Sequence, residues 1–372
     1  MLSKKNLVAL VLAPLLVAAL PAFAAPRYTV TALPGDTTPA AINNSGQVAG
    51  DFGSAGFVWS GGTLVPLGAM GGTFARATAI NGGGAVAGYS ELANGNVQAF
   101  RFSGGATTAL DVFGASHVYA MGISDSGQVA GQYFSQATGT RAFLHAGGVA
   151  SDLGDLGGGF AAANAVNNAG HAVGFSALDD APFHAHAFFY AGGVMHDLGA
   201  FPDASLSEAT AINEFDQVTG QGWVQGSFHA FLYDGGTLKD LGTLGGRESF
   251  AYDINASGQI VGYSDLAGDF DTVAFLWDGV SLLDLNALID PADGWTLYRA
   301  SGINDSGQIA AYGCRGGVCG GVLLDVAAAV PEPATFFLLM IGLGMLGWRR
   351  LRMTWRAGRE RNVPQGKEPQ LI

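Results

Sequence analysis

Three histidines and three aspartates lie close together in residues 179–197, and imidazole and carboxylate groups are ligands for transition metals. The set is His184, His186, His196, Asp179, Asp180 and Asp197. The position of His186 recurs along the chain, where it is occupied by Gln98, Arg141 and Val273. A position that tolerates such replacements favours a strand-edge role over metal ligation, so we predict no metal site here.

A second group of carboxylates belongs to one polar loop. Asp265, Asp269 and Asp271 could supply oxygen ligands to Ca²⁺, although their spacing fits no EF-hand. A solvated acidic loop is the preferred interpretation, and Ca²⁺ is kept as its alternative; no other cofactor is predicted. Trp295, in the insertion 289–295, could stack on a sugar ring or simply pack in the core. These four residues are the candidate ligand-binding residues of the loops, because variable loops on a rigid scaffold often bind the ligand.

No catalytic motif is found. The chain contains no G-x-S-x-G, H-E-x-x-H or Walker A pattern. Between residues 26 and 330 it carries 8 Lys and Arg against 27 Asp and Glu, a net charge of −19. This balance excludes nucleic acid as a partner. With so many carboxylates, nothing selects one pair for glycoside hydrolysis. We therefore predict no catalytic residues and a non-enzymatic binding or structural role; a polysaccharide-active enzyme is the alternative.

The elements that must position these residues come from a repeat. A turn flanked by apolar residues recurs with steps of 38, 43, 43, 46, 42 and 49 residues. Its seven copies begin at Ile42, Ile80, Ile123, Val166, Ile212, Ile254 and Ile303. The next residue is Asn in every copy except Ser124, and its side chain can bond the backbone two residues on. The turn ends in Gly, or once in Asp216, which predicts a left-handed residue closing a bulged hairpin.

One copy illustrates the four strands of a repeat. We expect strands at 249–254, 259–264, 273–277 and 281–285, with the turn at 255–258. The third strand keeps a small residue, usually Ala, followed by a Phe. These phenylalanines are Phe57, Phe100, Phe143, Phe188, Phe231 and Phe275. A small and a large apolar residue at one pitch predict stacked sheets, with the Phe filling the space between neighbours.

Four strands in each of seven repeats predict an all-β, seven-bladed β-propeller. The last copy has expected strands at 299–303, 308–312 and 321–325 but no fourth, whereas residues 28–35 resemble a spare fourth strand. The N-terminal strand would then close the ring and pair its exposed edges. An open β-repeat array is the alternative. Cys314 and Cys319 fall between the second and third strands of the last copy, and in an exported protein we expect a local disulfide there.

The repeats resemble a known family. His-Ala-Phe in the third strand at 186–188 and 229–231, and the Leu-Gly loops at 153–157 and 241–246, look like the HAF family of extracellular bacterial repeats. The resemblance covers residues 28–325, and the repeat domain is predicted at 26–328. It implies an extracellular location and a repeat architecture but no established activity.

Both ends carry targeting signals. Residues 1–24 read as a signal peptide, with Lys4, Lys5, an apolar stretch and Ala-Phe-Ala before the cleavage site. At 330–356, Pro331, Glu332 and Pro333 precede an apolar run and the cluster Arg349, Arg350 and Arg352, followed by a polar tail at 357–372. This pattern resembles the PEP-CTERM sorting signal of Gram-negative bacteria. The apolar run at 336–348 would then be a short transmembrane helix, shorter than the ~20 residues usual for a span.

That resemblance implies processing by an exosortase at the inner membrane and delivery to the cell surface or the extracellular matrix. The predicted partners are therefore the exosortase and the inner membrane, transiently, with extracellular polysaccharide as a further candidate. An ordinary C-terminal anchor is the alternative interpretation of the tail.

Overall fold

The computed structural model describes residues 28–179, 184–202, 204–268 and 271–327. The chain divides into two units, Met1–Ala327 and Ala328–Ile372. The second unit, the predicted signal peptide at 1–24 and Asp269 lie outside the described residues. The sequence predictions on residues 330–372 therefore have no structural counterpart here.

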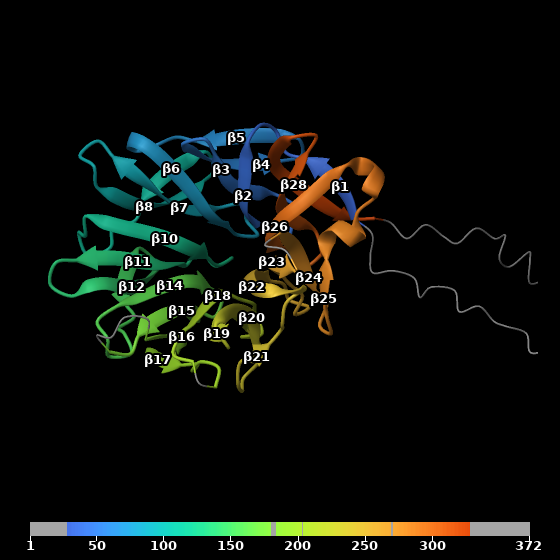
Figure 1. Ribbon diagram of the computed structural model, residues 1–372. Coiled ribbons are helices and arrows are strands. Elements are labelled where there is room, and N and C mark those ends of the chain that lie inside the picture. The colour runs from blue at the N-terminus through green and yellow to red at the C-terminus, as the bar shows by residue number, and fades with distance from the viewer. Residues whose placement is uncertain (1–27, 180–183, 203, 269–270, 328–372) are drawn as a thin grey trace, which may run out of the picture. The chain divides into compact units, whose positions relative to one another are not determined.

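The first unit is built from antiparallel β-sheets (Figure 1). Five sheets have four strands each. They are β2–β5 (Thr37–Ile42, Val48–Phe52, Ala55–Ser60, Thr63–Leu67), β14–β17 (Ala161–Val166, Ala172–Ala177, Ala185–Ala191, Val194–Asp197), β18–β21 (Ser207–Ile212, Val218–Val224, Ser227–Tyr233, Lys239–Asp240), β22–β25 (Gly245–Ile254, Ile260–Leu266, Thr272–Trp277, Leu282–Asp284) and β26–β28 (Trp295–Ile303, Ile309–Arg315, Val318–Val326) with β1 (Tyr28–Ala32).

The remaining sheet has eight strands and contains two copies of the repeat. It comprises β6–β9 (Gly71–Ile80, Val86–Leu92, Val97–Ser103, Ala106–Ala109) and β10–β13 (His117–Ile123, Val129–Ser135, Gly139–Ala146, Val149–Asp152). Within each half the strands pair antiparallel in chain order. A parallel pairing of His117 with Val97 joins the two halves.

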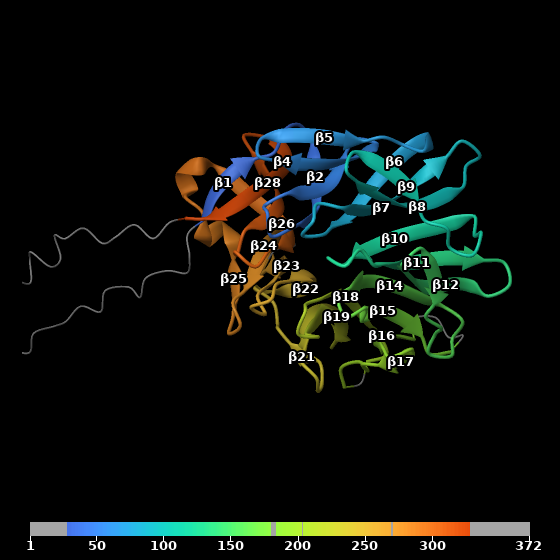
Figure 2. The ribbon, with the colours of Figure 1, turned by 180° about the vertical axis from the view of Figure 1, so that it is seen from behind.

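The two ends of the described segment meet in one sheet. β1 runs antiparallel to β28, with Tyr28 opposite Val326 and Ala32 opposite Val322. β1 and β28 lie side by side in both views of the ribbon (Figures 1 and 2). An N-terminal strand therefore completes the sheet whose other three strands come from the last repeat.

The predicted role of the repeated phenylalanines is confirmed. All six are buried, with at most 1% of each side chain exposed. Five of them pack in a cluster with alanines of the preceding copy, for example Phe100 with Ala49 and Phe188 with Ala130 and Ala142, and Phe57 packs with Ala310 of the last copy. The alanines let the sheets approach and the rings fill the gap. Sheets stacked in this way, with their first strands innermost, form an all-β propeller.

The recurring turn also links neighbouring sheets. In the first copy the Asn43 Oδ1 accepts hydrogen bonds from the Ser45 and Gln47 amides, both at 3.0 Å, and Gly46 has the predicted left-handed φ of 72°. The side-chain amide of each turn asparagine donates to the backbone carbonyl of the equivalent residue in the next copy. Six asparagines do this at 2.9–3.2 Å, namely Asn43, Asn81, Asn167, Asn213, Asn255 and Asn304. Asn304 donates to Asn43, across 261 residues.

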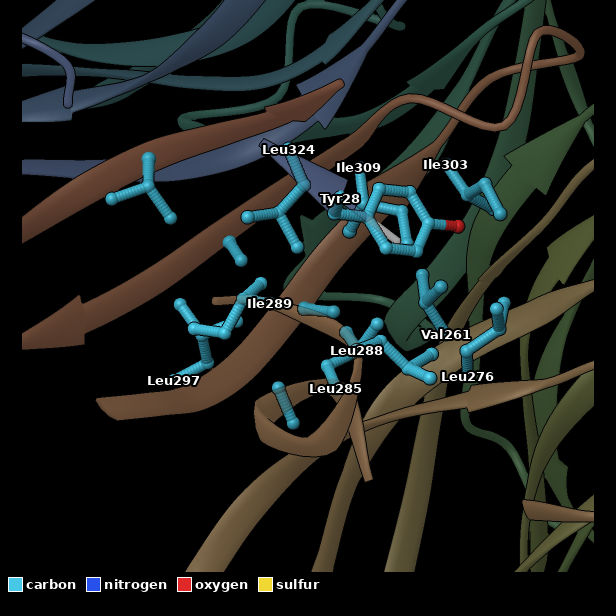
Figure 3. Packing of buried hydrophobic residues seen from close by; sticks show 14 residues of the cluster. Tyr28, Val261, Leu276, Leu285, Leu288, Ile289, Leu297, Ile303, Ile309 and Leu324 are labelled. Atoms are coloured by element: carbon cyan, nitrogen blue, oxygen red, sulfur yellow. The ribbon is translucent and has the colours of Figure 1, made fainter. Parts of the chain in front are cut away.

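Helical structure among the described residues is limited to two short 3₁₀ turns, η1 (Leu285–Leu288) and η2 (Pro291–Asp293). They lie in the long connection between β25 and β26, where the sequence shows an insertion. Leu285, Leu288 and Ile289 are buried against Tyr28 and Leu297 (Figure 3). The start of this connection therefore seals the core between the last two sheets.

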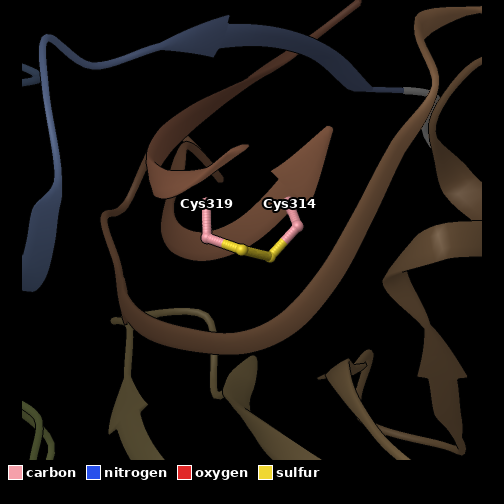
Figure 4. The surroundings of a disulfide bond; sticks show 2 residues. All are labelled: Cys314 and Cys319. Carbon is pink, nitrogen blue, oxygen red and sulfur yellow. A yellow bond between two sulfur atoms is a disulfide. The ribbon is translucent and has the colours of Figure 1, made fainter. Parts of the chain in front are cut away.

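Cys314 and Cys319 form a disulfide (Figure 4). Their expected position in the loop between two strands is corrected by the structure. The two cysteines lie inside β27 and β28 and face each other directly in the register. Only Gly316 and Gly317 connect these strands, because two left-handed glycines make a very tight turn.

No helix within the described residues has the length and apolarity needed to cross a lipid bilayer. The predicted transmembrane helix at 336–348 lies outside those residues.

Candidate functional site

A cavity of about 500 Å³ opens where the first strands of the sheets converge. We call it the axial cavity. Its walls include Ala40 of β2, Thr78 of β6, Met121 of β10, Asn164 of β14 and Thr210 of β18. β22 and β26 complete it with Tyr252, Arg299 and Ser301. Seven first strands thus contribute one to three residues each to the lining of a single cavity.

Two carboxylates face this cavity. Asp51 pairs with Arg76 at 3.2 Å; burial raises the pKa of Asp51, and the Arg76 charge opposes that rise. Glu208 accepts hydrogen bonds from the Asn164 side-chain amide at 3.1 Å and from that of Gln221 at 2.8 Å. Burial also raises the pKa of Glu208, because desolvation disfavours the charged form, and the two hydrogen bonds oppose the rise.

A groove of about 370 Å³ shares Thr38, Tyr252 and Arg299 with the axial cavity. We call it the tyrosine groove. The rest of its lining is Tyr263, Tyr298, Tyr312 and Thr272. The Arg299 guanidinium lies 5.8 Å from the centre of the Tyr252 ring. Burial raises the pKa of Tyr252 and Tyr263, so both phenols stay neutral near pH 7.

The histidines of the repeat have structural contacts. His186 Nδ1 lies 2.9 Å from the Asp197 carboxylate, and His229 makes the same contact with Asp240 at 3.0 Å. Each aspartate also accepts a bond from a backbone amide two residues on, that of Gly199 or Gly242, at 2.7 Å. The His-Ala-Phe strand is thus tied to the Asp-Leu-Gly strand beside it.

The histidine and aspartate group at 179–197 does not converge on one point. His184 contacts Asp179 at 3.3 Å, whereas His186 pairs with Asp197 on another strand. Across the described ranges, no three His, Cys, Asp or Glu side chains gather as a metal site would require. Asp180 lies outside those ranges.

The candidate ligand-binding residues of the loops are not brought to one site. Asp265 belongs to β23, not to the loop, and its carboxylate accepts a bond from the Thr272 hydroxyl at 3.4 Å. Asp271 contributes its backbone carbonyl to the Leu266 amide at 3.0 Å. Trp295 begins β26, packs against the core and lies 5.0 Å from Arg315. It lines a separate cavity of about 350 Å³ beside Cys319, which shares no residue with the tyrosine groove.

Sequence reasoning missed Glu208, Tyr252 and Arg299. A signal was present in the repeat. These residues stand five or three positions before the turn asparagine, where other copies carry Thr38, Ala162 or Ala40. Chemically distinctive residues at a position that varies between copies mark the inner lining.

One further carboxylate departs from the repeat in the wall of a cavity of about 200 Å³ that adjoins the axial cavity. Asp253 occupies the position that holds Ala or Gly in the other copies: Ala41, Ala79, Gly122, Ala165, Ala211 and Gly302. It accepts bonds from the Ile254 and Ile303 amides, both at 2.9 Å. Burial raises its pKa to about 7, and the nearby Asp305 adds to the rise.

This carboxyl should make stability depend on pH. Between about pH 4 and pH 7 the folded chain keeps a proton on Asp253 that the unfolded chain has released, so stability falls as the pH rises. We expect a smaller loss of unfolding free energy from pH 5 to pH 8 in Asp253→Ala than in the wild type. Urea unfolding at the two pH values measures both losses. Equal losses would show that Asp253 is already ionised at pH 5.

A comparison with known protein families finds a match at the C-terminus. Residues 329–352 match the PEP-CTERM protein-sorting motif. This range contains the predicted Pro-Glu-Pro and arginine cluster. The motif implies recognition by an exosortase, export and membrane-associated sorting to the cell surface. No curated protein matches the sequence.

Solved structures resemble the fold. A puromycin hydrolase mutant, S511A, complexed with PGG is 12% identical, with a TM-score of 0.50, and the match covers 80% of this chain and 54% of that one. The β-propeller domain of the Trilobed protease from Pyrococcus furiosus is 9% identical over 69% and 85%, with a TM-score of 0.45. A TolB from Agrobacterium tumefaciens is 10% identical over 70% and 89%, at 0.41. Likeness at such identities concerns the fold alone.

Proposed function

We propose that the protein is an exported, non-enzymatic binding module of the cell surface or extracellular matrix. Its ligand is extracellular polysaccharide, held where the axial cavity meets the tyrosine groove. The supporting observation is the groove itself: four tyrosines, two threonines and one arginine form a concave surface of about 370 Å³. Aromatic faces and hydroxyl groups are suited to the apolar faces and hydroxyls of sugar rings, and pockets of this size hold small ligands.

The scaffold proposed for this function is a seven-bladed ring. The eight-stranded sheet would count as two blades, because only His117 and Val97 pair between its halves. The pairing of β1 with β28 and the bond from Asn304 to Asn43 support closure by the N-terminal strand. The paired His-Ala-Phe and Asp-Leu-Gly strands support a place among the HAF repeats. Residues 1–24 would direct export as a signal peptide.

Binding can be tested with the full chain in mild detergent and the extracellular polysaccharide of the producing cells. We expect saturable binding, weakened at least about tenfold by Tyr298→Ala, because Tyr298 is exposed and lines the groove. Phe215→Ala is the matched control: this exposed ring lies in a hairpin turn and lines neither cavity. Absence of binding would exclude a polysaccharide ligand. Calcium dependence would support a cation near Asp265, at the end of β23, and Asp271, in the loop that follows.

The enzyme alternative has one specific support, the partly buried Glu208 in the axial cavity. A carboxyl with a raised pKa can act as a general acid on a glycosidic oxygen. Release of oligosaccharide by the wild type, abolished in Glu208→Gln with an unchanged melting temperature, would establish turnover. The non-enzymatic proposal expects no release from either protein.

A further inference from the structure

Arg299 differs from the other cations of this domain in its position, because it lines both the axial cavity and the tyrosine groove. Residues 28–327 contain only seven Lys and Arg, and two of them, Arg76 and Arg299, line the axial cavity. Arg76 is neutralised by Asp51 at 3.2 Å. Arg299 has no carboxylate within 4.0 Å among the described residues. In so acidic a protein, an arginine without a carboxylate partner at the junction of two cavities stands out.

The surroundings of Arg299 define what it can bind. Every other residue that lines the tyrosine groove is a Tyr or a Thr, so Arg299 is its one charged group. The side chain is half-buried, and Tyr252 lies beneath the guanidinium with 5.8 Å between charge and ring centre. Such a ring stabilises a cation without neutralising it. One guanidinium N–H bonds the Tyr252 hydroxyl, and the remaining N–H groups of the planar fork can form two parallel hydrogen bonds with a carboxylate.

We propose that the polysaccharide bound in this groove contains an acidic sugar, whose carboxylate pairs with Arg299 while its ring lies against the tyrosines. The inference rests on the proposed function and names the chemistry of its ligand. The net charge of the domain opposes a polyanion, but at 0.15 M salt repulsion is largely screened beyond about 8 Å. A charge-assisted pair between Arg299 and a sugar carboxylate acts at contact distance, so it determines the preference for an acidic over a neutral polymer.

The test compares native polysaccharide with the same material after its carboxylates have been reduced to primary alcohols. Titration calorimetry at 0.15 M salt measures binding of both to the full chain. We expect the native polymer to bind at least about tenfold more tightly, the factor that a pair worth ~1.4 kcal/mol supplies. In Arg299→Gln this preference should vanish, while the reduced polymer binds as it does to the wild type. Arg299→Lys should retain part of it.

Arg315→Gln is the matched control. Arg315 also lies over an aromatic ring, that of Trp295 at 5.0 Å, but it lines the separate cavity beside Cys319. This variant should keep the full preference for the native polymer. Melting temperatures of all three variants check that the fold is intact.

The other outcomes overturn the inference in distinguishable ways. Equal binding of native and reduced polymer would leave the proposed function standing and remove the acidic sugar. A preference that survives in Arg299→Gln would place the carboxylate elsewhere. Binding unaffected by reduction but lost in Arg299→Gln would indicate a sulfate or phosphate group instead. No binding of either polymer would overturn the proposed function as well.

Discussion

Gly262→Ala should unfold the propeller or lower its unfolding free energy by more than about 3 kcal/mol. A Cβ on Gly262 would lie 1.9 Å from the Phe250 carbonyl oxygen and 2.9 Å from the Phe275 ring. The carbonyl belongs to the backbone of the adjacent strand, so it cannot move aside without breaking the sheet. Thermal and urea unfolding, followed by circular dichroism, measure the loss.

The repeat explains why this glycine is required. The equivalent glycines are equally confined, with carbonyl oxygens 1.9–2.2 Å from the added atom. They are Gly50, Gly88, Gly131, Gly174 and Gly220. The last copy has Ala311 instead, opposite Val322 where the others have Phe. In the last copy the first strand, β26, has a register shift between Leu297 and Arg299, next to the pair of Ala300 and Ala311. The Cβ of Ala311 is accommodated there.

Two further variants separate the causes. Gly236→Ala is the control, because nothing lies within 4 Å of its added Cβ, and it should change stability by less than about 0.5 kcal/mol. Gly262→Ala combined with Phe275→Val imitates the last copy. We expect no rescue, since the Phe250 carbonyl stays in place. Stability equal to that of Phe275→Val alone would show that crowding by the ring is the cause.

Asn255→Ala should cost about 3 kcal/mol of unfolding free energy. Its side chain is 3% exposed and makes four hydrogen bonds. Two hold its own turn through the Ser257 and Gln259 amides, and one reaches the Asn304 carbonyl in the next sheet at 3.1 Å. Alanine removes all four bonds and leaves the buried Asn304 carbonyl without this donor. Urea unfolding measures the cost, and the exposed turn residue Asn94, changed to Ala, is the control.

One of the seven turns has a serine, Ser124, in place of the asparagine, so the opposite substitution can be tested there. The Ser124 side chain bonds only within its own turn, to the Ser126 hydroxyl at 2.8 Å and from the Gln128 amide at 3.2 Å. Ser124→Asn should restore the amide that could reach the Asn167 carbonyl and raise stability by about 1 kcal/mol. A loss in this variant together with no effect of Asn255→Ala would show that the asparagines shape individual turns and do not join the sheets.

Much of the scaffold could be predicted because its causes are local and repeated. The turn asparagine and glycine, the strand positions around 249–285 and the buried Phe of each third strand all follow from short-range rules. The N-terminal strand beside β28 follows from counting strands. The placement of Cys314 and Cys319 was wrong because strand ends depend on pairing: β27 and β28 extend until only two glycines remain between them.

The site was not predictable in the same way. The sequence predicted ligand-binding residues that are close together in the chain, such as Asp265 and Asp271, or that lie in an insertion, such as Trp295. In the structure Asp265 lies within β23, and Trp295 packs against the core. Arg299, Tyr252 and Glu208 come from different repeats, and only their spacing from the turn asparagine of their own repeat connects them.

The sequence by itself determined the repeat, its turns, its small and aromatic core positions and the sorting signal at its C-terminus. Each depends on residues a few positions apart, so composition and spacing suffice. Only the tertiary structure decided which side chains meet in the axial cavity and the tyrosine groove. Stacking of the sheets brings two positions of the repeat, five and three residues before the turn asparagine, to a common centre. There a residue that is unremarkable in its own repeat, such as Arg299, acquires neighbours from repeats far away in the chain.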